Sequence, residues 1–303
     1  MRVARLVGLH PSTLRPVQWD ARPRRAARPG RLPVSTAGEE ASVDDIRRAA
    51  DGLLGAYASG EPVEPLTTVY AGLTLGDAYA IQLAQIEEFR AKGARIKGHK
   101  VGLTSAAMQR QMNVDQPDFG VLLDTMFHLD SAPIDAGAFL QPRVEPEIAF
   151  VLGRPLAGPG VTAAEAAAAV DFVLPALEII DSRIRDWKIS LVDTVADNAS
   201  SGGVVLGTRP APLDAVDLRL AGCLLYRNGE LINTGAAGAA LGSPLNALVW
   251  LANTLGERGV SLEAGHVVLP GSITSAEPIS AGDVLTAEFA GLGTVTANFK
   301  GGS

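Results

Sequence analysis

Cysteine is almost absent from this chain, which has Cys223 as its single cysteine in 303 residues. One cysteine excludes an internal disulfide and a thiolate cluster around a metal, so the simple interpretation is a reducing cytoplasm. We expect Cys223 to be a core residue rather than a nucleophile. Aromatic residues are also few, at 5%, and we expect Trp187 and Trp250 to pack in the core.

The sequence also lacks a long apolar run and an excess of positive charge. No segment reaches the length of a membrane span. A net charge of -7 and a pI near 5.2 argue against a nucleic-acid partner, which would require a basic face. Repeats, a GxGxxG fingerprint and a Walker loop are missing as well. With 47% hydrophobic and 19% charged residues, the chain is typical of a globular protein with a sizeable core.

Residues 1–38 differ in composition from the rest of the chain. They contain eight arginines, one acidic residue (Asp20) and repeated prolines. The prolines interrupt any amphipathic helix, and no apolar segment with a cleavage site follows, so a targeting peptide is not favoured. We expect a disordered, dispensable Arg/Pro-rich extension, produced by an upstream start codon.

Two helices are expected next, and they define an N-terminal helical region over residues 39–95. The first begins after Ser42 and has apolar residues at helical spacing as far as Tyr57. The second covers residues 75–92 and ends before Gly93, although its apolar residues fit a single stripe only loosely.

Residues 96–303 are expected to form a β-rich catalytic domain. Strands are predicted at 96–103, 143–150, 172–180, 267–269, 284–289 and 294–299, and Asn228-Gly229 predicts a hairpin turn. Thr104 is the expected cap of a short helix, and residues 118–120 are expected to form a turn. A capping box at residues 162–165 and Ser243-Pro244 predict two further helices, the second reaching Gly259.

Three glutamates form the most informative pattern. Glu145 and Glu147 are separated by one residue in a predicted strand and therefore share a face. Glu178 lies in an apolar run that indicates a buried strand. Three converging buried carboxylates are tolerable only around a cation, and all-oxygen ligation selects Mg2+ or Mn2+. On spacing alone, Glu145 and Glu147 fit equally well as the solvated face of an amphipathic strand.

Five segments together resemble the 2-keto-4-pentenoate hydratase branch of the fumarylacetoacetate-hydrolase superfamily. They are Gly98–Ser105, Asp115–Gly120, Arg143–Glu147, Glu178–Arg183 and Val195–Ser201. The likeness runs in order from about Val43 to Phe299. It implies an α+β fold with N-terminal helices and a mixed β-sheet core shaped like a partly opened barrel. It also implies a bound Mg2+ or Mn2+.

The activity implied by the resemblance is hydration of a 2-hydroxy-2,4-dienoate from the meta-cleavage of aromatic compounds or steroids, giving a 4-hydroxy-2-oxo acid. Glu145, Glu147 and Glu178 match the family's metal ligands. Lys100 and Asp118 match its proton-transfer residues, with Lys100 as acid/base and Asp118 orienting it or deprotonating the attacking water. Without the resemblance, Lys100 would be interpreted as a surface lysine and Asp118 as a turn residue.

Further residues are assigned less uniquely. Ser200 falls where the family has a substrate-contacting hydroxyl, and the adjacent Ser201 is the alternative. Arg183 either helps to bind the substrate carboxylate or pairs with Asp181. His99 is expected on the strand face opposite Lys100, in packing. Asp197 and Asn198 are expected to brace a loop near the site or to be buried polar residues without a role there.

Three other functions compete with hydration. A sister decarboxylase of 2-oxo-hexenedioates (4-oxalocrotonate) would use the same metal site and lysine, but its pattern has an apolar residue in place of Asp118. A non-catalytic partner subunit would not need the complete set of metal and proton-transfer residues. Hydrolysis of the fumarylacetoacetate type would require a histidine-centred dyad. The expected partner is the small-molecule substrate, within a homo-oligomer that forms a complex with a downstream aldolase.

Overall fold

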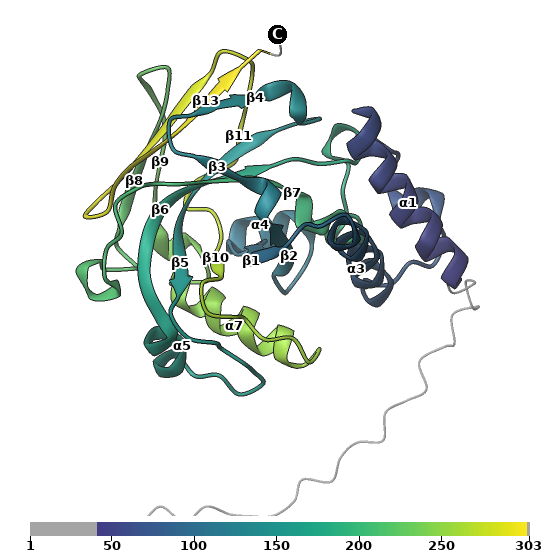
Figure 1. The fold of residues 1–303 in the computed structure, drawn as a ribbon, viewed down its shortest axis with the longest axis horizontal. Helices are drawn as coiled ribbons and strands as arrows, with labels where there is room; N and C mark the ends of the chain where they lie inside the picture. The colour runs from purple at the N-terminus through teal and green to yellow at the C-terminus, as the bar shows by residue number, and fades with distance from the viewer. Residues whose placement is uncertain (1–40, 302–303) are drawn as a thin grey trace, which may run out of the picture. The chain divides into compact units, whose positions relative to one another are not determined.

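The computed structural model describes residues 41–301, which belong to one compact unit, Gly38–Ser303 (Figure 1). The expected disorder of residues 1–38 lies outside the described residues. The fold is α+β: two mixed β-sheets form a half-barrel with helices around it, which confirms the predicted fold class. In the described part of the chain, no helix is both long and apolar enough to cross a membrane.

The N-terminal helices are α1 (Val43–Ser59), α2 (Leu66–Val69) and α3 (Leu75–Ala91). A capping box in which Ser42 and Asp45 bond each other's backbone starts α1, and Gly60 ends it in the left-handed conformation. Thr74 and Asp77 form the same motif at the start of α3. Local capping chemistry therefore sets the boundaries of both long helices close to the predicted positions.

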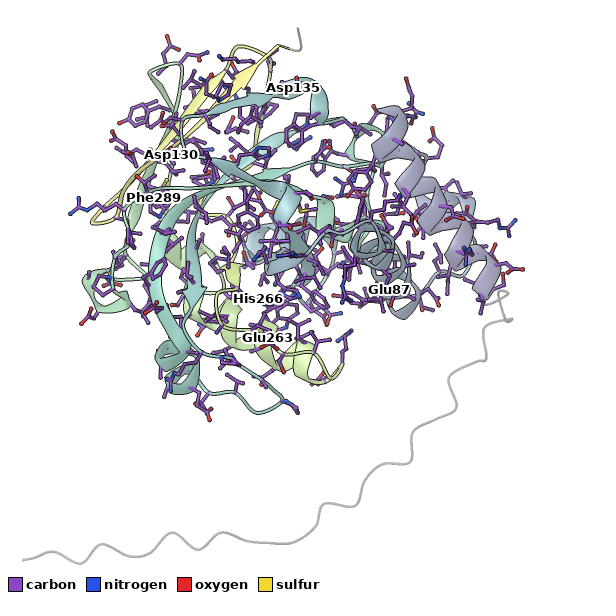
Figure 2. The ribbon with its side chains drawn as sticks, in the orientation of Figure 1. Glu87, Asp130, Asp135, Glu263, His266 and Phe289 are labelled. Atoms are coloured by element: carbon purple, nitrogen blue, oxygen red, sulfur yellow. The ribbon has the colours of Figure 1, made fainter. Side chains whose placement is uncertain are left out.

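Helix α3 has a loose apolar stripe because it buries two polar side chains. Gln82 Nε2 donates to the carbonyl of Phe119 at 2.9 Å and to that of Val195 at 3.1 Å, and Gln85 Nε2 donates to the carbonyl of Ala196 at 2.7 Å. Glu87, labelled in Figure 2, lies on the exposed side of the same helix. Hydrogen bonds from the two side-chain amides thus attach α3 to the backbone at Phe119 and at Val195 and Ala196.

The first sheet carries the predicted site residues. Its strands are, in spatial order, β2 (Asp118–Leu123), β1 (Ile96–Gly102), β10 (Val267–Leu269), β5 (Arg143–Leu152), β6 (Val170–Ile180), β7 (Ser201–Leu206) and β3 (Phe127–Leu129), with β11 (Glu277–Pro278) paired to β5. The turn predicted at residues 118–120 is wrong. These residues begin β2, because they pair antiparallel with β1 in the register Gly102↔Asp118 and Lys100↔Gly120.

Strands β5 and β6 form the longest antiparallel pair of the structure. Glu145 lies directly opposite Glu178, and the pairing continues without interruption from Arg143↔Ile180 to Val151↔Phe172. The one register shift in this pair lies between Val151 and Leu152, at the end away from the glutamates. Because the period of a strand is two residues, this register also turns Glu147 to the face that carries Glu145 and Glu178.

The second sheet closes the other side of the core. Its strands are, in order, β4 (Pro133–Asp135), β13 (Gly293–Lys300), β12 (Val284–Phe289), β8 (Gly222–Arg227) and β9 (Glu230–Ala236). The hairpin predicted at Asn228-Gly229 is confirmed, with φ of 53° and 85° at these two residues. Phe150 and Phe299 are fully buried in the main core, together with Phe289 (Figure 2).

Four further helices connect the strands: α4 (Ala106–Met112), α5 (Ala163–Ala169), α6 (Leu191–Ala196) and α7 (Pro244–Gly256). Figure 1 shows α5 and α7 together at one end of the sheets. The predicted Thr104 cap of α4 is wrong by one residue, because Ser105 Oγ accepts the hydrogen bond from the Met108 amide. Cys223 and Trp250 belong to or pack against the main core, as expected.

Candidate active site

Glu145, Glu147 and Glu178 converge as the sequence predicted. One carboxylate oxygen from each lies within 4.8 Å of the others. Glu147 and Glu178 are buried, and Glu145 is partly exposed to the cavity. The antiparallel register of β5 and β6 produces this cluster, so its geometry is fixed by backbone hydrogen bonds rather than by flexible loops.

The chemistry of the cluster fits a divalent cation. Within the described residues, Glu147 Oε1 and both oxygens of Glu178 are buried and accept no hydrogen bond, although Glu178 Oε1 forms an ion pair with Lys100, while Glu147 Oε2 accepts the Gly271 amide at 2.8 Å. Burial and the neighbouring Glu178 raise the pKa of Glu145 to about 7 and that of Glu147 well above its usual range. Unpaired buried carboxylates are costly, and a hard cation with oxygen ligands removes that cost. The three glutamates can therefore hold a metal ion.

Lys100 and Asp118 lie beside this cluster on the concave face of the sheet. They are diagonal neighbours across β1 and β2, since Asp118 faces Gly102, and both are buried. Lys100 Nζ lies 3.3 Å from Glu178 Oε1. A methyl group on Gly102 would collide with Asp118 Oδ1, so the missing side chain there makes room for the aspartate. His99 is buried on the other face of β1, in packing, as expected.

The protonation of this pair depends on its charged surroundings. Burial lowers the pKa of Lys100, but the carboxylates of Glu178 and Asp118 oppose it more strongly, and the net pKa is raised. Burial raises the pKa of Asp118, against the attraction of Lys100. Asp118 Oδ1 has no hydrogen-bond donor among the described residues. One carboxylate oxygen is thus available to a ligand or to water.

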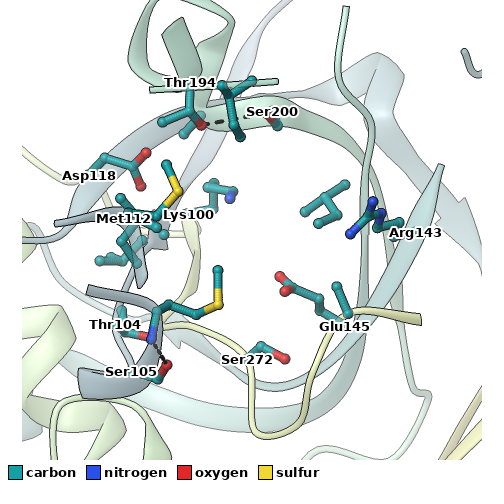
Figure 3. Close-up of a pocket in the computed structure, with 18 of the residues that line it drawn as sticks. Lys100, Thr104, Ser105, Met112, Asp118, Arg143, Glu145, Thr194, Ser200 and Ser272 are labelled. Carbon is teal, nitrogen blue, oxygen red and sulfur yellow. Dashed lines mark hydrogen bonds between the residues drawn. The ribbon is translucent and has the colours of Figure 1, made fainter. Parts of the chain in front are cut away.

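Ser200 reaches the site through an unusual backbone turn. Asn198, Ala199 and Ser200 all have φ near +50°, a left-handed conformation that non-glycine residues rarely adopt in succession. Asn198 stabilises the turn: its Oδ1 accepts the Val121 amide at 2.8 Å and its Nδ2 donates to the Val121 carbonyl at 2.9 Å. Ser200 lines the cavity, 3.5 Å from Thr194 Oγ1 (Figure 3), whereas Ser201 Oγ donates to the Asn198 carbonyl.

Of the two roles predicted for Arg183, substrate binding or a structural ion pair, the structure shows the ion pair. Its guanidinium is fully buried, donates to Asp197 Oδ1 at 2.6 Å and to the carbonyls of Asp197 and Ser201, and stacks 4.5 Å from the Tyr57 ring on α1. Asp181 is a distant second partner at 3.9 Å. The expected substrate contact of Arg183 is replaced by this ion pair, which braces the turn that presents Ser200.

Replacing Arg183 by methionine should destabilise the protein strongly. The change leaves the buried Asp197 carboxylate without its cation, which typically costs about 3–5 kcal/mol. The matched control is Arg185→Met, because Arg185 pairs with Glu64 at the surface with side chains 43% and 59% exposed, where ion pairs contribute little. Urea unfolding of both variants measures the difference. Equal stability of the two would contradict a bracing role for Arg183.

Glu145, Lys100, Asp118 and Ser200 line a cavity of about 350 Å³ (Figure 3), and Glu147 and Glu178 lie buried beside Glu145. Several residues that line the cavity were not singled out in the sequence as parts of the site, among them Thr194, Arg143 and Trp187. Arg143 was quoted only as part of a motif, although the alternation that pairs Glu145 with Glu147 also puts it on their face. Trp187 was expected in the core, but it lines the cavity. Trp187 belongs to a short helical turn at residues 185–187 that contains left-handed backbone, and no local sequence pattern predicts this conformation.

Comparisons with known proteins identify the family of this chain. The model of the Fumarylacetoacetate (FAA) hydrolase C-terminal family matches residues 92–300. The 2-keto-4-pentenoate hydratase of Paraburkholderia xenovorans (strain LB400) is 46% identical over 252 residues, which are 83% of this chain and 94% of that protein. The 2-oxo-hept-4-ene-1,7-dioate hydratase of Escherichia coli is 41% identical over 245 residues, 79% of this chain and 92% of that protein.

A solved structure shows the same fold. The 4-oxalocrotonate decarboxylase from Pseudomonas putida G7, complexed with magnesium and adipate, superposes with a TM-score of 0.83 at 37% identity, covering 86% of this chain and all of that chain. The same enzyme has also been solved with calcium and acetate. The chain therefore belongs to the fumarylacetoacetate hydrolase superfamily and, within it, to the 2-keto-4-pentenoate hydratase branch.

Proposed function

We propose that this protein hydrates a 2-hydroxy-2,4-dienoate of the 2-keto-4-pentenoate type to a 4-hydroxy-2-oxo acid, in the catabolism of aromatic compounds or steroids. The observation that carries the proposal is a buried carboxylate, Asp118, which lines one cavity with Lys100 and with Glu145, a member of the cluster of three glutamates. The hydratases to which the chain is similar support the same reaction. Hydration needs a group that takes a proton from water, and Asp118 is suited to that task.

The cofactor of the proposed reaction is Mg2+ or Mn2+, held by Glu145, Glu147 and Glu178. When bound, such an ion supplies Lewis acidity for a substrate carboxylate and its neighbouring C2 oxygen. Oxygen ligation by three carboxylates favours these hard ions. The complex of the related decarboxylase with magnesium supports this choice.

The protein's own residues perform the proton transfers. Lys100 Nζ donates a proton to C5 of the dienol and takes one back from the C2 hydroxyl, which becomes a ketone and leaves C4 electrophilic. Asp118 Oδ1 then accepts a proton from the water whose oxygen adds to C4, and returns that proton to C3 to complete the 4-hydroxy-2-oxo acid. Ser200 Oγ and Thr194 Oγ1, which lie 3.5 Å apart, hold the substrate by hydrogen bonds.

Decarboxylation of a 2-oxo-hexenedioate is the second candidate, favoured by the structural likeness to 4-oxalocrotonate decarboxylase. That reaction requires no activated water, so it gives Asp118 no task. As further proposals, the protein acts in the cytoplasm as a homo-oligomer and hands its product to a downstream aldolase within a complex.

The direct test is product identification. We expect the purified protein, incubated with freshly generated 2-hydroxypenta-2,4-dienoate and Mg2+, to form 4-hydroxy-2-oxopentanoate, detected by NMR. A parallel incubation with 2-oxo-hex-3-enedioate should release no CO2 above the uncatalysed rate. Release of CO2 without hydration of the pentadienoate would establish the decarboxylase instead.

A further inference from the structure

Arg143 is a cationic residue that lines the cavity but has no role in the proposed reaction. It begins β5 and shares its face with Glu145 and Glu147. Figure 3 shows its guanidinium on the side of Glu145 and across the cavity from Asp118. Along a strand, two residues span roughly 6.6 Å. The Arg143 side chain therefore reaches the space immediately beside a ligand held at Glu145.

The guanidinium is held in place without being neutralised. Its central carbon lies 4.5 Å from the centre of the Trp187 ring, and Trp187 Nε1 donates to the Gln141 carbonyl at 3.1 Å. The Gln141 side chain in turn donates to the carbonyls of Ser182 and Ile184, each at 2.8 Å. Among residues 41–301, no carboxylate lies within 4.0 Å of the guanidinium nitrogens, and they donate no hydrogen bond. This arrangement is suited to an anionic ligand.

The charge of the site indicates which anion. Three glutamates exceed the charge of a divalent cation by one, and Asp118 balances Lys100. Without Arg143, the loaded site would carry a net negative charge and would repel an anionic substrate. With Arg143 the site is neutral before the substrate enters. A guanidinium at this position removes that repulsion, and its fork matches the two oxygens of the one carboxylate that every 2-hydroxydienoate carries.

We propose that Arg143, positioned by Trp187, binds the C1 carboxylate of the substrate and makes the site specific for 2-oxo and 2-hydroxy acids. The inference rests on the proposed function and assigns to Arg143 the carboxylate recognition that the sequence had suggested for Arg183. A contact with a second, distal carboxylate is less favoured, because the guanidinium lies beside Glu145 rather than at a distance from the metal ligands.

The test measures binding rather than turnover. Calorimetry on Mg2+-loaded protein would compare two unreactive saturated analogues, 2-oxopentanoate with one carboxylate and 2-oxoheptanedioate with two. We expect Arg143→Met to weaken both by a similar factor, about 10- to 100-fold, the share of hydrogen bonds to a charged group. Binding of Mg2+ alone should be unchanged or tighter, because the variant removes a cation next to Glu145.

Two further variants separate recognition from simple damage to the fold. Arg143→Lys keeps the charge but not the fork and should recover part of the affinity for both analogues. Arg154→Met, at an exposed arginine just beyond the end of β5, is the matched control and should bind both analogues like the wild type.

The outcomes distinguish the inference from the proposed function. Wild-type affinity of Arg143→Met for both analogues would overturn the role of Arg143 while leaving the hydratase proposal intact. A loss confined to the dicarboxylate would overturn recognition of C1 and assign Arg143 to the distal group. Failure of the wild-type protein itself to bind either analogue would overturn the proposed substrate class together with the inference.

Discussion

Glu147→Gln should abolish the response of the protein to Mg2+ and leave a stable fold. The amide oxygen of glutamine can still accept the Gly271 N–H, which now bonds Glu147 Oε2 at 2.8 Å. Replacing one of three crowded carboxylates by a neutral group also removes repulsion in the metal-free protein. We expect turnover to fall on the order of 10³-fold or more, because Lewis-acid polarisation contributes several kcal/mol.

Thermal unfolding with and without Mg2+ provides a readout that does not depend on turnover. Ligand at 100 times its dissociation constant stabilises a native protein by about 2.7 kcal/mol. The wild type should gain stability of this order, whereas Glu147→Gln should gain none. Glu288→Gln, on the exposed face of β12, makes the same change of charge and should behave like the wild type. Full activity of Glu147→Gln after treatment with a chelator would refute the metal site.

Asp118→Asn should separate hydration from the step before it. Asparagine keeps the shape of the buried aspartate against Gly102 but cannot take a proton from water. Metal and substrate should still bind, and hydration should fall by about 10²- to 10⁴-fold, the usual share of a positioned acid or base. Protonation at C5 should continue, because Lys100 and the glutamates remain. We expect the 2-oxo-3-enoate intermediate to accumulate as formation of the 4-hydroxy-2-oxo acid fails.

Rapid-mixing absorbance and NMR of the products would follow these two steps. Asp115→Asn is the matched control, since Asp115 is exposed and lies three residues away. If Asp118→Asn hydrates at the wild-type rate, Asp118 has only a structural role in β2. The case for hydration over decarboxylation would then lose its main physical support.

The sequence predicted the convergence of the three carboxylates because their geometry follows largely from strand periodicity. Glu145 and Glu147 share a face in any strand, and only the position of Glu178 required tertiary pairing. The start of α1 and both ends of α3 are also set by local sequence, and they were predicted to within one residue. Lys100 and Asp118 were named through the resemblance, and the antiparallel pairing of β1 and β2 brings them together.

Three of the errors share one physical cause, which is that long-range contacts override local preference. Residues 118–120 have a turn-like sequence, but pairing with β1 makes them a strand. Arg183 has a partner, Asp197, that lies fourteen residues away in another loop, so its burial could not be inferred from its neighbours. Trp187 faces the cavity because a left-handed segment turns it out of the core.

The pairing of β5 with β6 has a consequence for how freely the chain can vary in length. Slipping this pair by one residue would turn Glu178 to the opposite face and dismantle the cluster completely, so an insertion inside the paired segments is not tolerated. A change of length in the connection from Gly153 to Ala169 would have a different effect. This connection joins the two strands beyond the register shift at Val151 and Leu152, and such an irregularity can accommodate an extra residue locally. A change of length in this connection would therefore leave the spacing of the carboxylates unchanged.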